Sequence, residues 1–292
     1  MKNKQTVYEI ITERIIDKLK EGVVPWHRPW KGGELGLPRN AATGRAYRGV
    51  NVWLLHCQGF DSNLWLTYKQ IKKFPGAWTL CGEKATPVTY WNWYEKEDPE
   101  NPDKKLKIPC LKYYRVWNVC QVGGLPDKFE SVEEELPQVF NSIENAENIT
   151  NKYKDRPLIK YDGRRAFYRP ATDSITMPNK ERFESSEEFY STLFHELTHS
   201  TGHEQRLNRK GISETHYFGD SVYSQEELVA EMGAAYLSGL AGIEEITLDN
   251  SASYINGWLR KLTNNPKWVV IAAAQAQKAV DYILSPNVES EA

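Results

Sequence analysis

The sequence predicts an α+β protein of two domains, and three observations support this. The chain has 292 residues, enough for two domains that each bury a core. Residues 1–128 are basic, with 21 Lys and Arg against 13 Asp and Glu, whereas residues 129–292 are acidic, with 16 against 26. Eight of the ten Trp residues also lie in the basic part. We therefore predict a first domain at 1–128, a linker at 129–136 and a second domain at 137–292.

The first half combines helical and strand patterns. Residues 3–21 place apolar side chains at helical spacing and end before Gly22, which predicts an amphipathic helix. The segments Thr86–Trp93 and Lys112–Asn118 alternate between apolar and polar residues, as half-buried strands do. We expect a small α+β domain with a modest antiparallel sheet.

The run from His195 to His199 matches the pattern H-E-x-x-H. Residues four apart lie on one face of an α-helix, so both imidazoles can reach a single metal ion. Glu196 lies beside this pair and is placed to act as general base on a metal-bound water. Ser185, followed three residues later by Glu188, predicts that the helix begins with a capping box. We expect a zinc site of the hydrolase type.

A catalytic zinc ion usually takes a third protein ligand, and the acidic helix predicted at 224–237 offers three carboxylates. Glu227 is the favoured ligand. Glu231 is the second choice and is otherwise expected to accept the outer N–H of a ligand imidazole, and Glu226 is the third choice. Because Glu227 follows Ser224 by three residues, it could instead be only the capping glutamate of this helix.

His203 is the remaining rival for the third ligand. It lies one turn beyond His199, but three histidines at this spacing span about 12 Å of helix axis and cannot all reach one ion. Gln205 occupies the position at which the longer pattern H-E-x-x-H-x-x-G-x-x-H requires His. We therefore expect His203 to have a local structural or substrate-side role.

Basic and aromatic residues are interleaved in the first half. Lys and Arg can follow the phosphates of a single strand while flat rings stack on its bases, at about 1–3 kcal/mol per base. The chain contains no base-reading motif, so we expect binding that is independent of sequence. The candidate contact residues are Trp26, Arg28, Trp30, Arg39, Arg45, Tyr47, Arg48, Lys69, Lys84 and Tyr90. We expect Trp53, Trp65, Trp91 and Trp117 to include core residues, because Trp is usually largely buried.

The composition argues against several other classes of protein. No apolar run approaches the roughly 18 residues of a membrane span, and the N-terminal residues lack the apolar region of a secretory signal. Cys57, Cys81, Cys110 and Cys120 form no C-x-x-C pair, which argues against a Cys-ligated zinc and for reduced thiols. We expect a cytoplasmic protein without a membrane partner.

Short motifs follow one another along nearly the whole chain. The first half contains Pro38-Arg-Asn, Thr43-Gly-Arg, Gly49-Val-Asn51, Gly82-Glu-Lys84 and Trp117-Asn-Val-Cys-Gln121. The second contains Met177-Pro178, the H-E-x-x-H run, Gly202-His203, Arg206-Leu-Asn208 and the acidic run at 226–231. In this order the sequence resembles the ArdC antirestriction proteins. Their N-terminal single-stranded-DNA-binding domain, also present in TraC-type plasmid primases, precedes a zincin-like metallopeptidase domain.

The resemblance implies a bacterial, cytoplasmic protein of conjugative plasmids or related mobile elements. It implies binding to single-stranded DNA and protection of incoming DNA from host restriction. It also implies a zincin fold, distantly similar to DNA-dependent repair proteases of the Spartan type. The gluzincin-like site would use His195 and His199 as ligands, Glu196 as base and a Glu of 226–231 as third ligand. Zinc is the expected metal, and His-His-Glu sites also accept manganese or cobalt.

Two other functions fit the sequence. The protein could be a non-catalytic binder that shields DNA or occupies a restriction enzyme, with a structural metal. It could also be a general cytoplasmic metallopeptidase whose basic half docks acidic proteins. If it is a peptidase that acts on DNA-associated proteins, we expect an extended peptide to pair with an edge strand at Ser174–Met177. Tyr223 or His216 would then stabilise the oxyanion.

Overall fold

The structure is a computed structural model that describes residues 5–27, 36–98, 101–126, 129, 142–162, 164–213, 221–243 and 252–284. The predicted α+β fold is confirmed. Arg28, Trp30 and His216 lie outside the described residues, as does the predicted linker apart from Phe129. Within the described ranges, no helix is long and apolar enough to cross a membrane.

The first half begins with helix α1, Val7–Lys20. Its N-cap Thr6 accepts a hydrogen bond from the backbone of Glu9, whose carboxylate accepts one from the Thr6 backbone in return. This reciprocal pair fixes the helix start. The chain leaves the helix through Gly22, whose φ of 78° favours glycine. Three short helical segments follow: η1 (Pro25–His27), α2 (Val50–His56) and α3 (Tyr68–Ile71).

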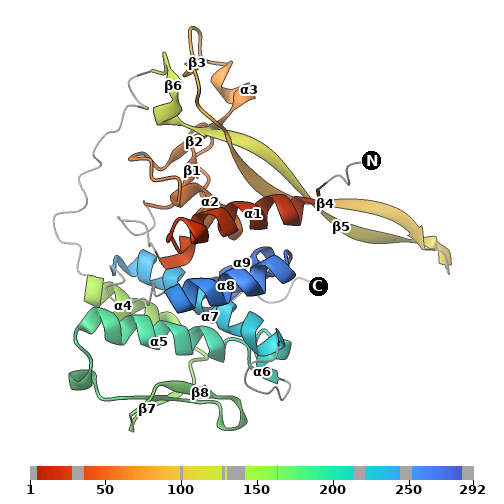
Figure 1. Ribbon diagram of the computed structural model, residues 1–292. Helices are drawn as coiled ribbons and strands as arrows, with labels where there is room; N and C mark the ends of the chain where they lie inside the picture. Colours follow the sequence, from red (N-terminus) through yellow and green to blue (C-terminus); the bar gives the residue numbers. More distant parts are fainter. Residues whose placement is uncertain are drawn as a thin grey trace.

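A four-stranded sheet has the order β1-β2-β5-β4, with β1 at Arg39–Asn40, β2 at Leu64–Thr67, β4 at Thr86–Asp98 and β5 at Asn101–Asn118. A separate pair joins β3 (Trp78–Thr79) to β6 (Val122–Gly123), which follows η2 (Val119–Gln121). The β4–β5 hairpin is much longer than predicted, and its distal part projects away from the body of the molecule (Figure 1). The alternating pattern did not predict this part because its described side chains, at 95–97 and 105–107, are exposed and mostly charged.

The second half consists mainly of helices: α4 (Ser142–Lys152), α5 (Ser186–Ser200), α6 (Lys210–Ser213), α7 (Ser221–Ala241), α8 (Ala252–Asn264) and α9 (Trp268–Leu284). A small sheet has the order β7-β9-β8, at Leu158–Tyr161, Ser174–Met177 and Phe167–Arg169. The segments η4 (Pro170–Thr172) and η5 (Lys180–Arg182) flank β9.

The prediction of an edge strand at Ser174–Met177 is wrong. This strand is the central one, paired in parallel with β7 and antiparallel with β8. Pro178 marks the end of the strand in the sequence. It gives no information about whether the two sides of the strand are paired. Both sides of β9 are therefore already paired over Ser174–Thr176, which leaves no free side there for a bound peptide.

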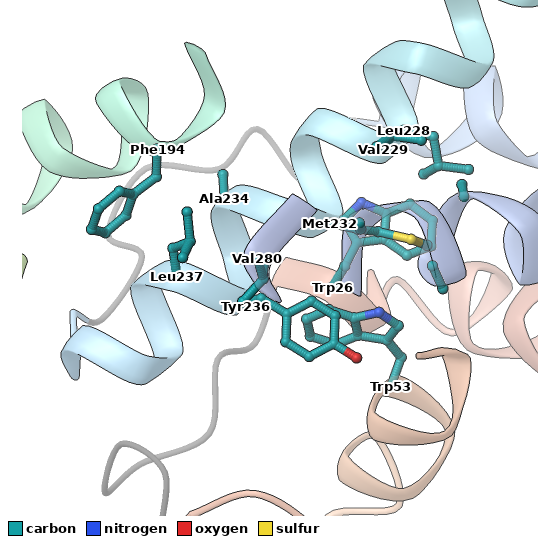
Figure 2. Packing of buried hydrophobic residues seen from close by; sticks show 14 of the residues in the cluster. Trp26, Trp53, Phe194, Leu228, Val229, Met232, Ala234, Tyr236, Leu237 and Val280 are labelled. Carbon is teal, nitrogen blue, oxygen red and sulfur yellow. The ribbon is translucent and has the colours of Figure 1, made fainter. Parts of the chain in front are cut away.

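One continuous hydrophobic cluster joins the two halves. Trp53 of α2 packs against Tyr236 of α7 with ring centroids 4.6 Å apart, and the Tyr236 hydroxyl donates to the Gly49 carbonyl at 2.8 Å (Figure 2). Trp26 of η1 meets the ring of Trp258 edge-on at 6.0 Å. Helix α7 is therefore packed by side chains from both halves.

Two aromatic residues that were predicted to contact DNA belong to the interior instead. Trp26 is 0% exposed and Tyr47 is 8% exposed. Burial of such large rings contributes about 25 cal/mol per Å² of apolar surface, so the core competes for them with any ligand. An interleaved basic and aromatic sequence does not show whether an aromatic ring is buried in the core or exposed to bind DNA. Trp53 and Trp65 are buried, as expected.

A largely buried ion pair ties the small sheet to the end of α5. Arg206, whose side chain is 6% exposed, reaches Asp173 at 2.7 Å and also donates to the carbonyls of Ser200 and Asp155. Burial by itself raises the pKa of Asp173. Hydrogen bonds from Arg206 and Tyr168, with the Arg206 charge, outweigh burial and hold that pKa below its ordinary value.

Replacement of Asp173 by Asn should lower the stability by about 1–2 kcal/mol at neutral pH, less than for a fully buried pair because Asp173 is partly exposed. Asn tolerates the left-handed conformation of this residue, φ 41°. Because the folded-state pKa of Asp173 is lowered, its contribution is complete above the unfolded pKa of about 3.9. It is lost as the pH falls through the folded value. Urea unfolding from pH 7 to pH 3 should show the two proteins converging in acid; a constant gap would contradict this account.

Candidate metal centre

Helix α5 presents the two histidines of the H-E-x-x-H run. Ser185 caps the helix and accepts a hydrogen bond from the Glu188 backbone at 3.1 Å. The Glu188 carboxylate accepts from the backbone of Glu184 rather than from Ser185, so only half of the predicted capping box forms. Phe189, Leu193, Phe194 and Leu197 are buried along the helix. These apolar contacts fix its rotation, and α5 packs against α7.

Helix α7 supplies the third candidate ligand. It begins at Ser221, three residues before Ser224, so Ser224 lies inside the helix and Glu227 is not a capping residue. The Glu227 carboxylate reaches both imidazoles: Oε2 lies 3.6 Å from His195 Nε2 and Oε1 lies 3.6 Å from His199 Nε2.

The three side chains fit a divalent metal ion. One ligand atom from each lies within 4.8 Å of the other two, and the two Nε2 atoms are 3.1 Å apart. Four ligands placed tetrahedrally at about 2.0–2.1 Å from zinc are separated by about 3.3 Å, close to these distances. Imidazole and carboxylate donors of this kind bind zinc, manganese or cobalt.

Glu226, which is itself bound by Arg209, contacts the Nδ1 side of the His199 ring, away from Nε2. The Nδ1 atom of His199 is 3.3 Å from Glu226 Oε1, and this carboxylate is 4% exposed. Arg209 binds the same carboxylate through Nη2 at 2.6 Å and Nε at 3.0 Å, and it also donates to the Thr201 hydroxyl and the Thr198 carbonyl. A proton on Nδ1 that Glu226 accepts leaves the Nε2 lone pair of His199 free for a metal.

Glu226 is expected to be ionised despite its burial. Burial by itself raises the pKa of Glu226. The hydrogen bond from His199 and the positive charge of Arg209 outweigh burial, so this pKa lies below its ordinary value. In the sequence, Glu226 was the least favoured ligand and Arg209 carried no signal, because no motif spacing connects residue 209 to the histidines. The contact between them exists only after α6 and α7 fold against α5.

Glu231 makes a different contact from the one predicted. Its carboxylate accepts hydrogen bonds from Trp26 Nε1 at 3.0 Å and from the Tyr254 hydroxyl, not from the outer N–H of His199. Burial raises the pKa of Glu231, and these two donors partly offset that effect. Glu231 lies one turn after Glu227, so this contact ties the ligand helix to the first half.

The other predicted site residues are placed as follows. Glu196 is 7% exposed, and its charge acts on His195. Burial by itself lowers the pKa of His195, but the hydrogen bond that its ring donates to Glu227 and the nearby carboxylates raise this pKa overall. His203 accepts from the Gln205 backbone through Nδ1 and lies outside the ligand group. The side chain of Tyr223 lies outside the described residues.

The predicted DNA-contact residues that the structure describes do not share one environment. Arg45, Lys69, Lys84 and Tyr90 are exposed, and Arg39 is half-buried. Arg48 is exposed but forms an ion pair with Asp281 of α9. This pair connects the two halves, and Asp281 offsets the charge that a phosphate would contact.

Two known domain families match this chain. Residues 5–117 match the N-terminal domain of the anti-restriction factor ArdC, and residues 144–275 match a zincin-like metallopeptidase domain. The ligand geometry lies inside the second match. The fold and the site therefore define a protein with an ArdC-type first half and a zincin-like second half that is suited to a divalent metal.

The solved structures narrow this class further. The metal-free crystal structure of the antirestriction protein ArdC from plasmid R388 is 33% identical, with a TM-score of 0.72, over 95% of this chain and 96% of that one. Its Mn(II)-bound structure is 32% identical, with a TM-score of 0.74, over 99% of this chain and all of that one. The chain belongs to the ArdC family of antirestriction proteins.

Longer relatives share only part of their length with this chain. Two proteins named DNA primase TraC from Escherichia coli are 37% and 35% identical over 98% and 97% of this chain. The chain spans only 20% and 27% of these primases. An uncharacterised protein, y4eC of Sinorhizobium fredii, is 29% identical over 98% of this chain and 94% of its own length.

Gly233 allows α7 to approach α5 beside the ligands. A Cβ atom at Gly233 would lie 2.4 Å from Thr198 Cγ2 and 2.6 Å from Thr198 Oγ1. In a solvent-exposed helix, Gly→Ala stabilises by about 1 kcal/mol. Gly233→Ala should do the opposite, lowering the melting temperature and weakening metal binding as the helices separate. Gly257→Ala in α8, where nothing lies within 4 Å, is the matched control and should be neutral or stabilising. Equal thermal shifts for the two variants would contradict the packing argument.

Glu226→Gln should weaken the binding of a divalent metal by about 10–100-fold, because it removes the charged acceptor behind His199. Calorimetric titration with Zn²⁺ measures this, and circular dichroism checks that the variant remains folded beside the now unpaired Arg209. Glu204→Gln, at an exposed position outside the ligand group, is the control. If Glu226→Gln binds zinc as tightly as the unchanged protein, Glu226 does not orient His199.

Proposed function

We propose that this protein is an antirestriction protein of a mobile element that binds single-stranded DNA without sequence preference and carries a zinc peptidase site. The observation that carries the enzymatic part is the convergence of His195, His199 and Glu227 with Glu196 next to the first ligand. Membership of the ArdC family supports a DNA partner and a role against restriction in the bacterial cytoplasm.

The chain's own residues would divide the chemistry among them. A zinc ion held by His195, His199 and Glu227 would acidify a water molecule and polarise a peptide carbonyl. Glu196 would take a proton from the water and later deliver one to the leaving amine. Glu226, fixed by Arg209, would keep His199 in the tautomer that offers Nε2. DNA-bound proteins or restriction enzymes would be the substrates or targets.

The opposite charges of the two halves support a different role for each. The first half is basic and the second acidic, so phosphates would contact residues 1–128 and the peptidase would occupy 137–292. The two family matches, 5–117 and 144–275, fall on either side of the proposed boundary. Because both halves share one hydrophobic cluster, experiments on the DNA-binding part should use the full chain.

Glu196→Gln should retain zinc while losing peptidase turnover by at least about 100-fold, since the general base is gone but the ligands remain. His195→Ala, in contrast, should lose both. Turnover of fluorescent casein with and without single-stranded DNA measures the activity, and calorimetry measures the zinc. Conjugative transfer into a restricting host measures protection in parallel. If Glu196→Gln turned casein over at the unchanged rate, the assignment of the base would be wrong.

A further inference from the structure

The β4–β5 hairpin exposes an unusual number of aromatic rings. Tyr90, Trp91, Trp93, Tyr94, Tyr113 and Tyr114 are between 37% and 60% exposed. Large rings of this kind are usually mostly buried, so such a group on one hairpin suggests a binding surface. The strand segments 86–94 and 108–118 that carry these rings contain two cations and no Asp or Glu.

The strand register sorts these rings onto two faces. Residues opposite each other in an antiparallel pair point to the same face, and Tyr90 is opposite Lys112 while Val88 is opposite Tyr114. Tyr90, Tyr94, Lys112 and Tyr114 therefore share one face, which we call the tyrosine face. The Tyr90 and Tyr114 ring centroids are 5.7 Å apart, and Lys112 Nζ lies 4.8 Å from the centre of the Tyr94 ring.

Charge distinguishes the tyrosine face from the opposite one. From the Thr86–Val116 pair to the Lys96–Leu106 pair, the tyrosine face contains Lys96 and Lys112 and no carboxylate. Over the same pairs the opposite face, which carries Trp91 and Trp93, contains Glu95 together with Lys107 and Arg115. At its base that face borders a groove beside α1 whose lining includes Glu13, Asp17, Arg14 and Arg115. Cations and carboxylates are thus mixed on the opposite face, whereas the two lysines of the tyrosine face have no carboxylate among these pairs, which favours a polyanion on the tyrosine face.

We propose that the tyrosine face of the β4–β5 hairpin is the stacking surface for single-stranded DNA. Unpaired bases would stack on Tyr90, Tyr94 and Tyr114, and phosphates would lie beside Lys112 and Lys96. Rings two residues apart on a strand repeat every ~6.8 Å, so Tyr90 and Tyr94 span about 13 Å of a strand. In a duplex the faces of the bases are covered by their neighbours, which selects the single strand.

This inference rests on the proposed DNA-binding function and names the surface that performs it. Of its five residues only Tyr90 was among the sequence-based candidates. A protein partner or a second copy would also cover the rings, and the sedimentation measurement below separates that outcome. Flat exposed rings beside lysines are the combination that an unpaired, phosphate-bearing strand contacts. The charge pattern therefore favours nucleic acid.

The test is fluorescence anisotropy of the full chain with a labelled oligothymidylate at two salt concentrations. Tyr90→Ala, Tyr94→Ala and Tyr114→Ala should each weaken binding by roughly 5–150-fold, whereas the corresponding Phe variants, which keep the ring, should bind nearly as the unchanged protein does. Lys112→Gln should reduce the slope of log affinity against log salt by about 0.7, the value for one phosphate contact on a single strand.

Two matched controls locate the surface. Tyr161→Ala removes a tyrosine that is 54% exposed in the acidic half, and Trp93→Ala removes a ring from the opposite face of the same hairpin. Neither should change the affinity as much as the tyrosine-face variants. If all three Tyr→Ala variants bind like the unchanged protein, the surface is wrong while DNA binding stands. If the unchanged protein fails to bind even at low salt, the proposed DNA function falls as well.

A second measurement does not depend on folded variants. Ultraviolet crosslinking of the unchanged protein to a bromodeoxyuridine oligonucleotide, followed by peptide mapping, should mark 90–94 and 112–114. Crosslinks confined to other segments would overturn the assignment. So would sedimentation showing that the Tyr→Ala variants abolish self-association and leave DNA affinity intact.

Discussion

The close crossing of α5 and α7 is the constraint on which the candidate site depends. Two ligand atoms come from one helix and the third from the other, and they meet within 4.8 Å. Gly233 permits this approach because any side chain there would collide with Thr198, the residue before His199. The buried pair of Glu226 and Arg209 lies at the same crossing, so its polar groups are satisfied only when the helices are correctly placed.

Helix α7 also connects this site to the first half of the chain. Glu227 faces the histidines, whereas Glu231, one turn further, accepts a hydrogen bond from Trp26. Tyr236, three residues after Gly233, packs its ring on Trp53 (Figure 2). One helix thus carries a ligand and part of the core that both halves share, so the two halves are mechanically continuous although their charges are opposite.

The opposite charges and the division of aromatic residues separate two kinds of chemistry on one molecule. Buried rings such as Trp26 and Trp53 hold the halves together, while the rings of the β4–β5 hairpin remain exposed beside lysines. The same residue types therefore serve the core at one position and a surface at another. Between the Thr86–Val116 and Lys96–Leu106 pairs the tyrosine face contains no carboxylate, whereas carboxylates gather around the histidines, where cations rather than phosphates are favoured.

Local patterns in the sequence determined the helix with His195 and His199, the cap at Ser185 and the family motifs, because these depend on spacing of one or two turns. The choice among Glu226, Glu227 and Glu231 was open in the sequence, since all three lie on one acidic helix. Only the tertiary structure gives the three carboxylates different surroundings: α7 is rotated so that Glu227 faces the imidazoles, Glu226 meets Arg209 and Glu231 meets Trp26. Burial of Trp26 and the central place of β9 were decided in the same way. Each depends on contacts between residues far apart in the chain, and local periodicity does not encode such contacts.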